Sequence, residues 1–387
     1  MDENNINKKY GAKIDIKISR NPLIFDFKKI EKKFVHSVKE NSFLFFNDKS
    51  NKLSISEYHD KIKEDEHVIF KIDFENDKVQ FINFLYKDSF KRKEMFYNYI
   101  NELNFRLYKI LEKYQNDKNI DNTYFLEMYD IIKMNKIKLI LRDCKINEKR
   151  NYDKNPQYIF LLEDEKNENC ILCKKSGSSP ENPLIHLCDC KVHFECKKKE
   201  IKELLNSKKM NNDENCIKYT IKTKCKFCQQ KFPLYFLCNN KQFELLDIPK
   251  DDDFLLFESL DNIDKNIYYI KLDKNKNKEK ILISSPDDNK DIINKFDKFI
   301  EIDNNLISNE KAMIECDKLN KTLALKNIGD ENNISVLQEK ILLKPNNDKL
   351  LIYFANILIE AQLINNDKFV DIEKEIEKNS ENIEERK

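Results

Sequence analysis

The sequence predicts an α+β, multidomain protein in which a small cysteine-rich finger separates two larger regions. Its 387 residues leave room for two or three domains of about 100–200 residues each. Short alternating apolar runs occur on both sides of residues 165–240, and most of the 11 cysteines fall inside that segment. We therefore expect an N-terminal region at 1–160, the finger at 165–240, a β-sandwich at 262–363 and a charged tail at 364–387.

Residues 1–160 are expected to contain both strands and a helix. Apolar residues alternate with polar ones at 14–18, 43–46, 68–74 and 79–84, a pattern that predicts strands separated by turns. Between residues 91 and 115 the apolar period becomes helical, without Pro or Gly, which predicts a helix facing the core.

The C-terminal region again has short runs with turn residues between them, and the chain as a whole shows no internal repeat of fixed period. This regular spacing predicts strands of a β-sandwich. The runs lie at 267–272, 280–284, 299–302, 311–316, 322–326, 340–343 and 349–354. The tail is rich in Lys, Glu and Asn, as expected of a solvated helix or a disordered segment.

Composition excludes several classes of function. The chain has only 3 glycines, whereas a Walker A loop, a GxGxxG fingerprint and a GxSxG nucleophile elbow each need clustered ones. The formal net charge of +1 argues against a nucleic-acid partner, because phosphate binding favours a basic excess. Basic residues at 197–199 are followed by acidic ones, which favours a solvated helix face.

Neither an export signal nor a membrane span is expected. Residues 1–9 are polar, and the longest apolar run, 350–361, is shorter than the roughly 20 residues that a spanning helix needs. We therefore expect a cytoplasmic or nuclear protein with no membrane partner. In such a compartment, paired cysteines indicate metal binding rather than disulfides.

Eight residues of the finger have the spacing of metal ligands. Cys-x-x-Cys and similar short pairs let one tight turn place two thiolates on one ion, and zinc takes four N or S ligands. Four such pairs predict two Zn²⁺ ions. The candidate metal ligands are Cys170, Cys173, Cys188, Cys190, His193, Cys196, Cys225 and Cys228.

The pairing of these ligands has two solutions. If adjacent ligand pairs combine, the two zinc sites form two separate units along the chain. If alternate pairs combine, the two sites interlock in one cross-braced unit. The cross-brace would join Cys170, Cys173, His193 and Cys196 in one site, with Cys188, Cys190, Cys225 and Cys228 in the other. It explains how 28 residues fit between Cys196 and Cys225, where we expect a helix at 194–208 and a strand at 217–221.

At these residues the sequence resembles the RING-CH (RING-variant) zinc finger. The resemblance rests on the C4HC3 ligand order, the one-residue spacer at Asp189, and the stretches "ENPLIHLCDC" and "CKFCQQKFP". It implies an E3 ubiquitin-ligase-like component that has no catalytic side chain of its own, docks a charged E2 enzyme and orients its thioester. Leu172, just before Cys173, matches the apolar E2-docking surface of that family.

Three departures from the RING-CH pattern favour an alternative function. Only Lys191 and Val192 separate Cys190 from His193, Glu200 stands where a Trp is usual, and Lys197 replaces an apolar residue. Charged side chains at anchor positions weaken an interface whose affinity depends on a few residues. The alternative is a non-catalytic, zinc-stapled adaptor for protein–protein interaction.

A second resemblance lies downstream, where residues 262–363 resemble a degenerate FHA domain. The stretches "IEIDNNLISNEKAMIE" and "LALKNIGDENNISVLQ" carry it, and "YDIIKMNKIKLILRD" resembles a further segment of FHA/RING-CH proteins. The resemblance implies a sandwich that binds a protein partner, with Ser308 and Asn332 at its phosphopeptide site. Arginine is absent between Arg150 and Arg386, so no bidentate phosphate clamp is expected there.

Overall fold

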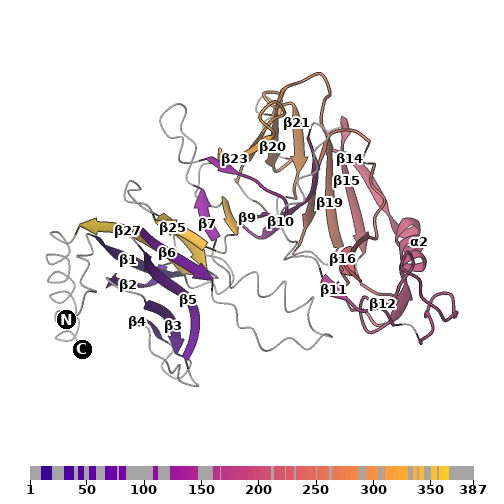
Figure 1. Ribbon diagram of the computed structural model, residues 1–387. Helices are drawn as coiled ribbons and strands as arrows, with labels where there is room; N and C mark the ends of the chain where they lie inside the picture. Colours follow the sequence, from indigo (N-terminus) through magenta and orange to yellow (C-terminus); the bar gives the residue numbers. More distant parts are fainter. Residues whose placement is uncertain are drawn as a thin grey trace. The chain divides into compact units, whose positions relative to one another are not determined.

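The computed structural model contains two compact units (Figure 1). One is drawn from Met1–Ser89, Glu102–Ile110 and Ser335–Lys387, and the other from Phe90–Asn101 and Leu111–Ile334. The structure describes residues 10–19, 30–38, 42–47, 52–57, 66–75, 78–83, 108–111, 123–146, 160–165, 167–210, 213–222, 224–230, 232–249, 251–260, 264–286, 293–303, 307, 310–329, 334–337, 340–343, 350–354 and 357–365.

The first unit is a β-sandwich. One sheet has the strand order β7-β26-β27-β1-β2, and the other has the order β25-β6-β5-β3-β4. The strands are β1 (Tyr10–Ser19), β2 (Ile30–Val38), β3 (Ser42–Asn47), β4 (Lys52–Glu57), β5 (Glu66–Glu75), β6 (Lys78–Asn83), β7 (Tyr108–Leu111), β25 (Lys340–Leu343), β26 (Leu350–Phe354) and β27 (Ile357–Asn365). The four N-terminal runs predicted as strands are therefore confirmed.

Alternation places the core of this sandwich between its two sheets. In β1, Ala12, Ile14 and Ile16 are buried while Lys13 and Asp15 are partly exposed, as the two-residue period of a strand requires. One apolar cluster combines side chains from both sheets: Ala12, Ile14, Ile16, Val38, Leu44, Ile72, Val79, Phe81, Leu350, Ile352, Ile359 and Ala361.

The helix predicted at 91–115 is wrong where the structure describes it. Tyr108–Leu111 form strand β7, whose Lys109 pairs with Ile352 of β26. Ile110 and Leu111 are both buried, so tertiary pairing decides the conformation of an apolar run that fits helix or strand equally. The remainder of the predicted helix lies outside the described residues.

The second unit contains the cysteine-rich finger and most of the remaining strands. They are β8 (Thr123–Phe125), β9 (Ile131–Met134), β10 (Ile137–Lys145), β11 (Phe160–Leu162), β12 (Leu184–His186), β13 (Lys191–His193), β14 (Asn206–Met210), β15 (Asp213–Lys222), β16 (Tyr235–Cys238), β17 (Lys241–Glu244), β18 (Phe254–Ser259), β19 (Asp264–Lys271), β20 (Lys278–Ser284), β21 (Lys298–Glu301), β22 (Ala312–Asp317) and β23 (Thr322–Asn327). Strand β24 (Ile334–Leu337) has Ile334 in this unit and its other three residues in the first. The helix of the second unit is α2 (Phe194–Leu204).

The fold is therefore β-rich, and the runs predicted as strands between 267 and 354 are confirmed. The described part of the chain includes no helix long and apolar enough to cross a membrane. The predicted range 262–363 is divided between the units, because β26 and β27 join the sheet of β1 while β19 to β23 belong to the second unit.

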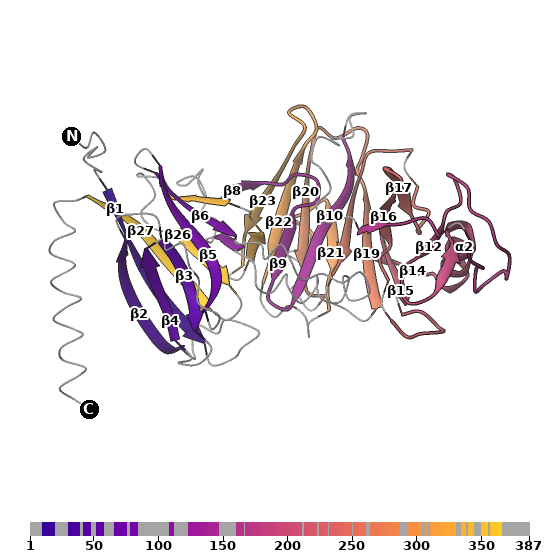
Figure 2. The same cartoon turned by 60° about the horizontal axis from the view of Figure 1, so that its bottom comes forward.

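The second unit is layered around a central sheet (Figure 2). Its strands run in the order β14-β15-β19-β18-β10-β9, and β18 is buried along its whole length. On one side β21, from the sheet β21-β20-β22-β23-β8, packs against β14 and β15. On the other side Leu256, Ile267 and Tyr269 share an apolar cluster with the finger and with β16 and β17. The finger is thus one layer of this unit.

A fully buried charge cluster lies in the central sheet. Arg142 of β10 donates to the Glu258 carboxylate of β18, and Lys265 of β19 donates to the same group, with Nζ 2.6 Å from Oε1. The Arg142 guanidinium also lies 5.3 Å from the ring centre of Tyr235 on β16. Burial alone would raise the pKa of Glu258, but Arg142 and Lys265 outweigh burial and lower it.

Replacing this carboxylate should destabilise the unit strongly. Glu258→Gln leaves two buried cations without their shared counter-charge, and breaking a buried ion pair costs about 3–5 kcal/mol. Denaturant unfolding of the full chain measures the change. The matched control is Glu315→Gln, whose carboxylate pairs with Lys326 at a partly exposed position. This substitution leaves one cation that water can still reach, so it should cost much less than Glu258→Gln. Equal, small effects for both variants would contradict the role given to Glu258.

Candidate metal centre

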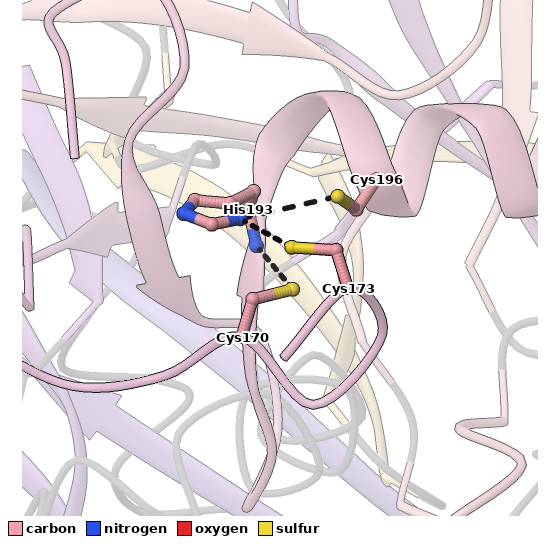
Figure 3. Close-up of side chains that lie close together, drawn as sticks. All are labelled: Cys170, Cys173, His193 and Cys196. Carbon is pink, nitrogen blue, oxygen red and sulfur yellow. Dashed lines mark hydrogen bonds between the residues drawn. The ribbon is translucent and has the colours of Figure 1, made fainter. Parts of the chain in front are cut away.

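The eight candidate ligands come together in two groups of four. Within each group, all ligand atoms lie within 4.8 Å of one another. Figure 3 shows the thiols of the first group gathered around the His193 ring. The groups are Cys170, Cys173, His193 and Cys196, and Cys188, Cys190, Cys225 and Cys228. Alternate pairs therefore combine, as the cross-brace predicts, and the arrangement as two separate units along the chain is wrong.

The two Cys-x-x-Cys turns have the same backbone structure. In each turn, the backbone amide of the residue four positions after the first cysteine donates to the carbonyl of that cysteine. The backbone amide of the same cysteine donates to the carbonyl of the residue five positions after it. The bonds measure 2.8 and 3.0 Å in the first turn and 2.8 Å for both in the second. Lys174 and Gln229, at the fourth position, both have a φ of 61°. Each turn is thus a preformed knuckle that points two thiols to one side.

The hairpin between the knuckles supplies the remaining ligands. Strands β12 and β13 pair with Ile185 opposite Val192, and the turn between them carries Cys188 and Cys190. His193 ends β13, and Cys196 follows in the first turn of α2. Three extended steps of about 3.3 Å carry the chain about 10 Å from Cys190 to His193. The short spacer therefore reaches from one group to the other.

The imidazole of His193 is oriented for ligation through Nδ1. Its Nε2 lies 2.6 Å from the carbonyl oxygen of Gly177, so Nε2 carries the proton and donates it. Nδ1 then presents its lone pair to the sulfurs, 3.3 Å from Cys173 Sγ and 3.9 Å from Cys196 Sγ. A carbonyl on the far nitrogen of a metal-binding histidine is the usual way of fixing its tautomer.

The thiols of the first group differ in acidity. Burial raises the pKa of Cys170, but amide donors from Cys173, His193 and Leu172 outweigh it and lower the pKa to about 7. Burial, together with the neighbouring Cys173 and Cys170, raises the pKa of Cys196 to about 12. One thiolate therefore opposes the ionisation of the next.

The second group also contains cysteines with lowered and with raised pKa values. Amide donors from Cys228 and Phe227 lower the pKa of Cys225 against the effect of burial, and the pKa of Cys190 is raised to about 12 by burial, Cys228 and Cys225. A bound dication removes this conflict, because it favours the thiolate form of every ligand. Three sulfurs with one nitrogen, and four sulfurs, are both donor sets of structural zinc sites. Each group can hold one metal ion, and both are consistent with zinc.

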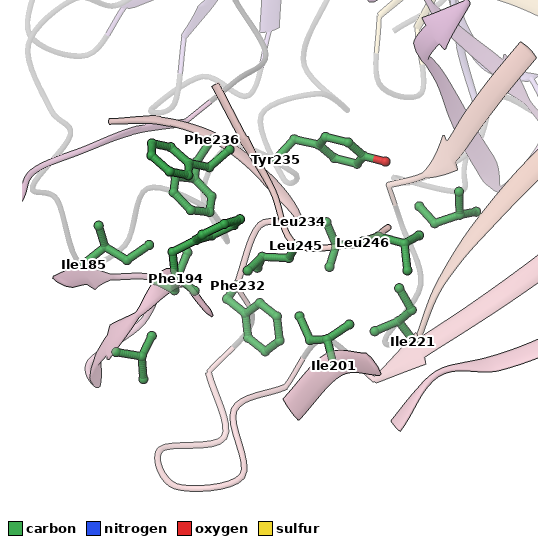
Figure 4. Packing of buried hydrophobic residues seen from close by; sticks show 14 of the residues in the cluster. Ile185, Phe194, Ile201, Ile221, Phe232, Leu234, Tyr235, Phe236, Leu245 and Leu246 are labelled. Atoms are coloured by element: carbon green, nitrogen blue, oxygen red, sulfur yellow. The ribbon is translucent and has the colours of Figure 1, made fainter. Parts of the chain in front are cut away.

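The finger is packed into the unit through α2. Phe194, the first residue of the helix, meets Phe236 and Phe243 edge-on, with ring centres 6.2 and 4.9 Å away. Ile201, two turns later, is buried in the same cluster. Figure 4 shows Phe194 and Ile201 gathered with Phe232 and with Phe236 of β16. The cluster joins the metal groups to the central sheet.

Lys197 and Glu200 are not free surface charges. The Lys197 side chain is buried, with Nζ 2.7 Å from Glu200 and 4.0 Å from the ring centre of Phe232. Glu200 also pairs with Lys226 of the second knuckle at 2.8 Å. Burial alone would raise the pKa of Glu200, but Lys197 and Lys226 lower it. The pair therefore links α2 to the knuckle.

Leu172 and Phe227 occupy the same position in the two knuckles, directly before the second cysteine. Leu172 is partly buried against the core, whereas 48% of Phe227 is exposed. Phe227 was missed by sequence reasoning, and superposing the two Cys-x-x-Cys motifs is the signal that would have found it.

The remaining cysteines, His186 and the predicted phosphopeptide residues are not part of either group. Cys144, Cys216, Cys238 and Cys316 are buried and belong to neither group, and His186 is also outside both. Ser308 and Asn332, the predicted phosphopeptide residues, lie outside the described residues. Comparison with protein families, curated proteins and solved structures finds no match for this chain. The RING-CH and FHA resemblances therefore rest on the residues quoted above.

Removing the metal should unfold the finger and loosen the central sheet beside it. Structural zinc contributes roughly 10–16 kcal/mol of apparent binding energy in finger peptides. Treating the full chain with a zinc chelator should raise amide hydrogen exchange across 167–230, including β15, which lies between Cys196 and Cys225. Strands β1 to β6 serve as the internal control and should keep their protection. Unchanged exchange in the finger after complete chelation would contradict this.

Proposed function

We propose that residues 167–230 bind two structural zinc ions and form a RING-CH-like docking module, an E3 ubiquitin-ligase-like component with weak affinity for an E2 enzyme. The gathering of eight ligands into two groups of four carries the proposal. Each group supplies a complete tetrahedral set, and catalytic zinc sites keep one position open. The metal ions therefore have a structural role, because they hold the module in one conformation.

The zinc ions supply cross-links that a chain segment this small cannot replace by packing alone. Cys170 and Cys173 tie the first knuckle to α2 through Cys196, and Cys225 and Cys228 tie the second knuckle to the β12–β13 turn. Gln230 strengthens the second tie, because its side-chain oxygen accepts from the Asp189 amide at 3.0 Å. These links hold Leu172 and Phe227 in fixed positions on equivalent turns.

Leu172 and Phe227 are the apolar anchors that support E2 docking. Small interfaces depend on a few such side chains. Between α2 and the second knuckle, however, the ion pairs of Glu200 with Lys197 and Lys226 take the place of a third apolar anchor. An interface with two anchors and a charged centre supports weak docking.

The same ion pairs favour a second candidate, a non-catalytic adaptor. In that case the module keeps its zinc-dependent shape and binds a protein other than an E2. Ubiquitin discharge separates the candidates, because an adaptor does not accelerate release of ubiquitin from any E2.

Discharge of ubiquitin from a panel of charged E2 enzymes tests the proposal. The full chain should increase the rate of ubiquitin discharge only slightly, with one or more E2 enzymes. Leu172→Ala or Phe227→Ala should make this increase smaller still. Truncating an anchor costs about 2 kcal/mol or more, roughly 30-fold in affinity. The control is Leu319→Ala, an exposed leucine of the β22–β23 turn. Discharge as fast as that of an ordinary RING ligase, or none with any E2, contradicts weak docking.

A gain-of-function variant gives a sharper test. Glu200→Trp alone would leave Lys197 buried without its carboxylate, so Lys197→Leu must accompany it. The double variant should raise E2 affinity and ubiquitin discharge, while Cys173→Ser should abolish both by unfolding the first site. No gain in a folded, zinc-loaded double variant would favour the adaptor.

We further propose that the C-terminal FHA-like sequence binds its protein partner without a tight phosphothreonine site. Phosphate carries about −1.5 to −2 charges and is usually clamped by arginine. The 149–387 part of the chain has only Arg150 and Arg386, and Lys311 offers a point charge. Calorimetry with phosphothreonine peptides should find no sub-micromolar binding that depends on the phosphate. Such binding would contradict this.

A further inference from the structure

The two units share one strand topology. In the first unit, one sheet contains the order β2-β1-β27-β26 and the other is β4-β3-β5-β6-β25. In the second unit, the central sheet contains the order β19-β18-β10-β9 and the other is β21-β20-β22-β23-β8. Strands β1 to β6 thus correspond to β18 to β23 in the same sequence order, and β25 to β27 correspond to β8 to β10.

The strand pairings agree in detail. Two residues separate the strands in both hairpins, β26–β27 and β9–β10, with Phe354 opposite Ile357 in one and Met134 opposite Ile137 in the other. Each last strand is antiparallel to the first strand of its sandwich: β27 to β1, and β10 to β18. The strand at the edge of each second sheet is antiparallel to the last of the six strands of its sandwich: β25 to β6, and β8 to β23. The one difference is that β3 and β4 are antiparallel whereas β20 and β21 are parallel.

Chain order shows how the two copies are connected. Along the sequence, β1 to β6 are followed by β8 to β10, and β18 to β23 are followed by β25 to β27. In the structure, however, β25 to β27 complete the sandwich of β1 to β6, and β8 to β10 complete that of β18 to β23. Each set of six strands is closed by three strands from the other half of the chain.

We infer that the protein is a tandem duplication of one β-sandwich whose two copies have exchanged their last three strands within a single chain. Exchange of an identical element costs little, because the same kinds of contact form in either arrangement. The duplication gives no repeat of fixed period in the sequence, because the finger and loops of unequal length separate the equivalent strands.

The finger occupies the junction between the copies and favours the exchanged form. It connects β10, the last strand of the first copy, with β18, the first strand of the second, and these two strands pair side by side. The finger's apolar cluster includes Phe254 and Leu256 of β18, so a folded finger stabilises the strand with which β10 pairs. Without exchange, β10 would pair with β1 instead.

Matched substitutions in the two equivalent strands test the exchange. The hairpin registers make Ile359 of β27 equivalent to Leu139 of β10, and both side chains are fully buried. Ile359→Ala in the full chain should raise amide hydrogen exchange roughly tenfold or more in β1, β5 and β6, and leave β18 to β22 unchanged. Leu139→Ala should do the reverse. If each variant loosens the six strands that precede it in its own half of the chain, or both loosen the two sandwiches equally, the inference is overturned.

A disulfide trap gives a second measurement that does not depend on destabilisation. Asp15 of β1 lies opposite Glu360 of β27, and Ile140 of β10 is the residue equivalent to Glu360. Asp15→Cys with Glu360→Cys should form an intrachain disulfide on oxidation, located by peptide mapping, in a monomeric protein. Asp15→Cys with Ile140→Cys is the control and should not. A bond in the control pair, or one that joins two chains, would overturn the inference.

Discussion

The finger depends on bound metal, because its closely spaced thiolates repel one another. Without a cation, Cys170 ionises readily, but its charge and the surrounding burial hold the pKa of Cys196 at about 12. A metal ion converts this repulsion into four bonds that no local hydrogen bond could replace. Because knuckles, hairpin turn and α2 each supply part of a site, two ions fix all four elements at once.

The same constraint extends into the second unit. Strands β14 and β15 lie between the sixth and seventh ligands, yet β15 pairs with β19 of the central sheet along its length. Arg142, Glu258 and Lys265 lie in that sheet, and Arg142 reaches Tyr235 on β16, just after the second knuckle. Metal sites, central sheet and buried charges therefore form one cooperative structure.

Sequence reasoning reached the metal ligands and most strands, because ligand spacing and two-residue alternation are local properties. It misjudged Tyr108–Leu111, where pairing with β26 decides between helix and strand. It also placed Lys197 and Glu200 on a docking surface, since their partners Phe232 and Lys226 are distant in sequence. The exchange of strands between the two sandwiches is a long-range pairing that no local pattern encodes.

Counting the bound metal tests the central claim most directly. Native mass spectrometry of the full chain, purified without chelators or added metal, should show two zinc ions per chain. Both should be lost together with the folded charge-state distribution when the protein is acidified, because the ligand thiolates become protonated. A folded protein carrying no zinc, or a single ion per chain, would contradict the two-site cross-brace.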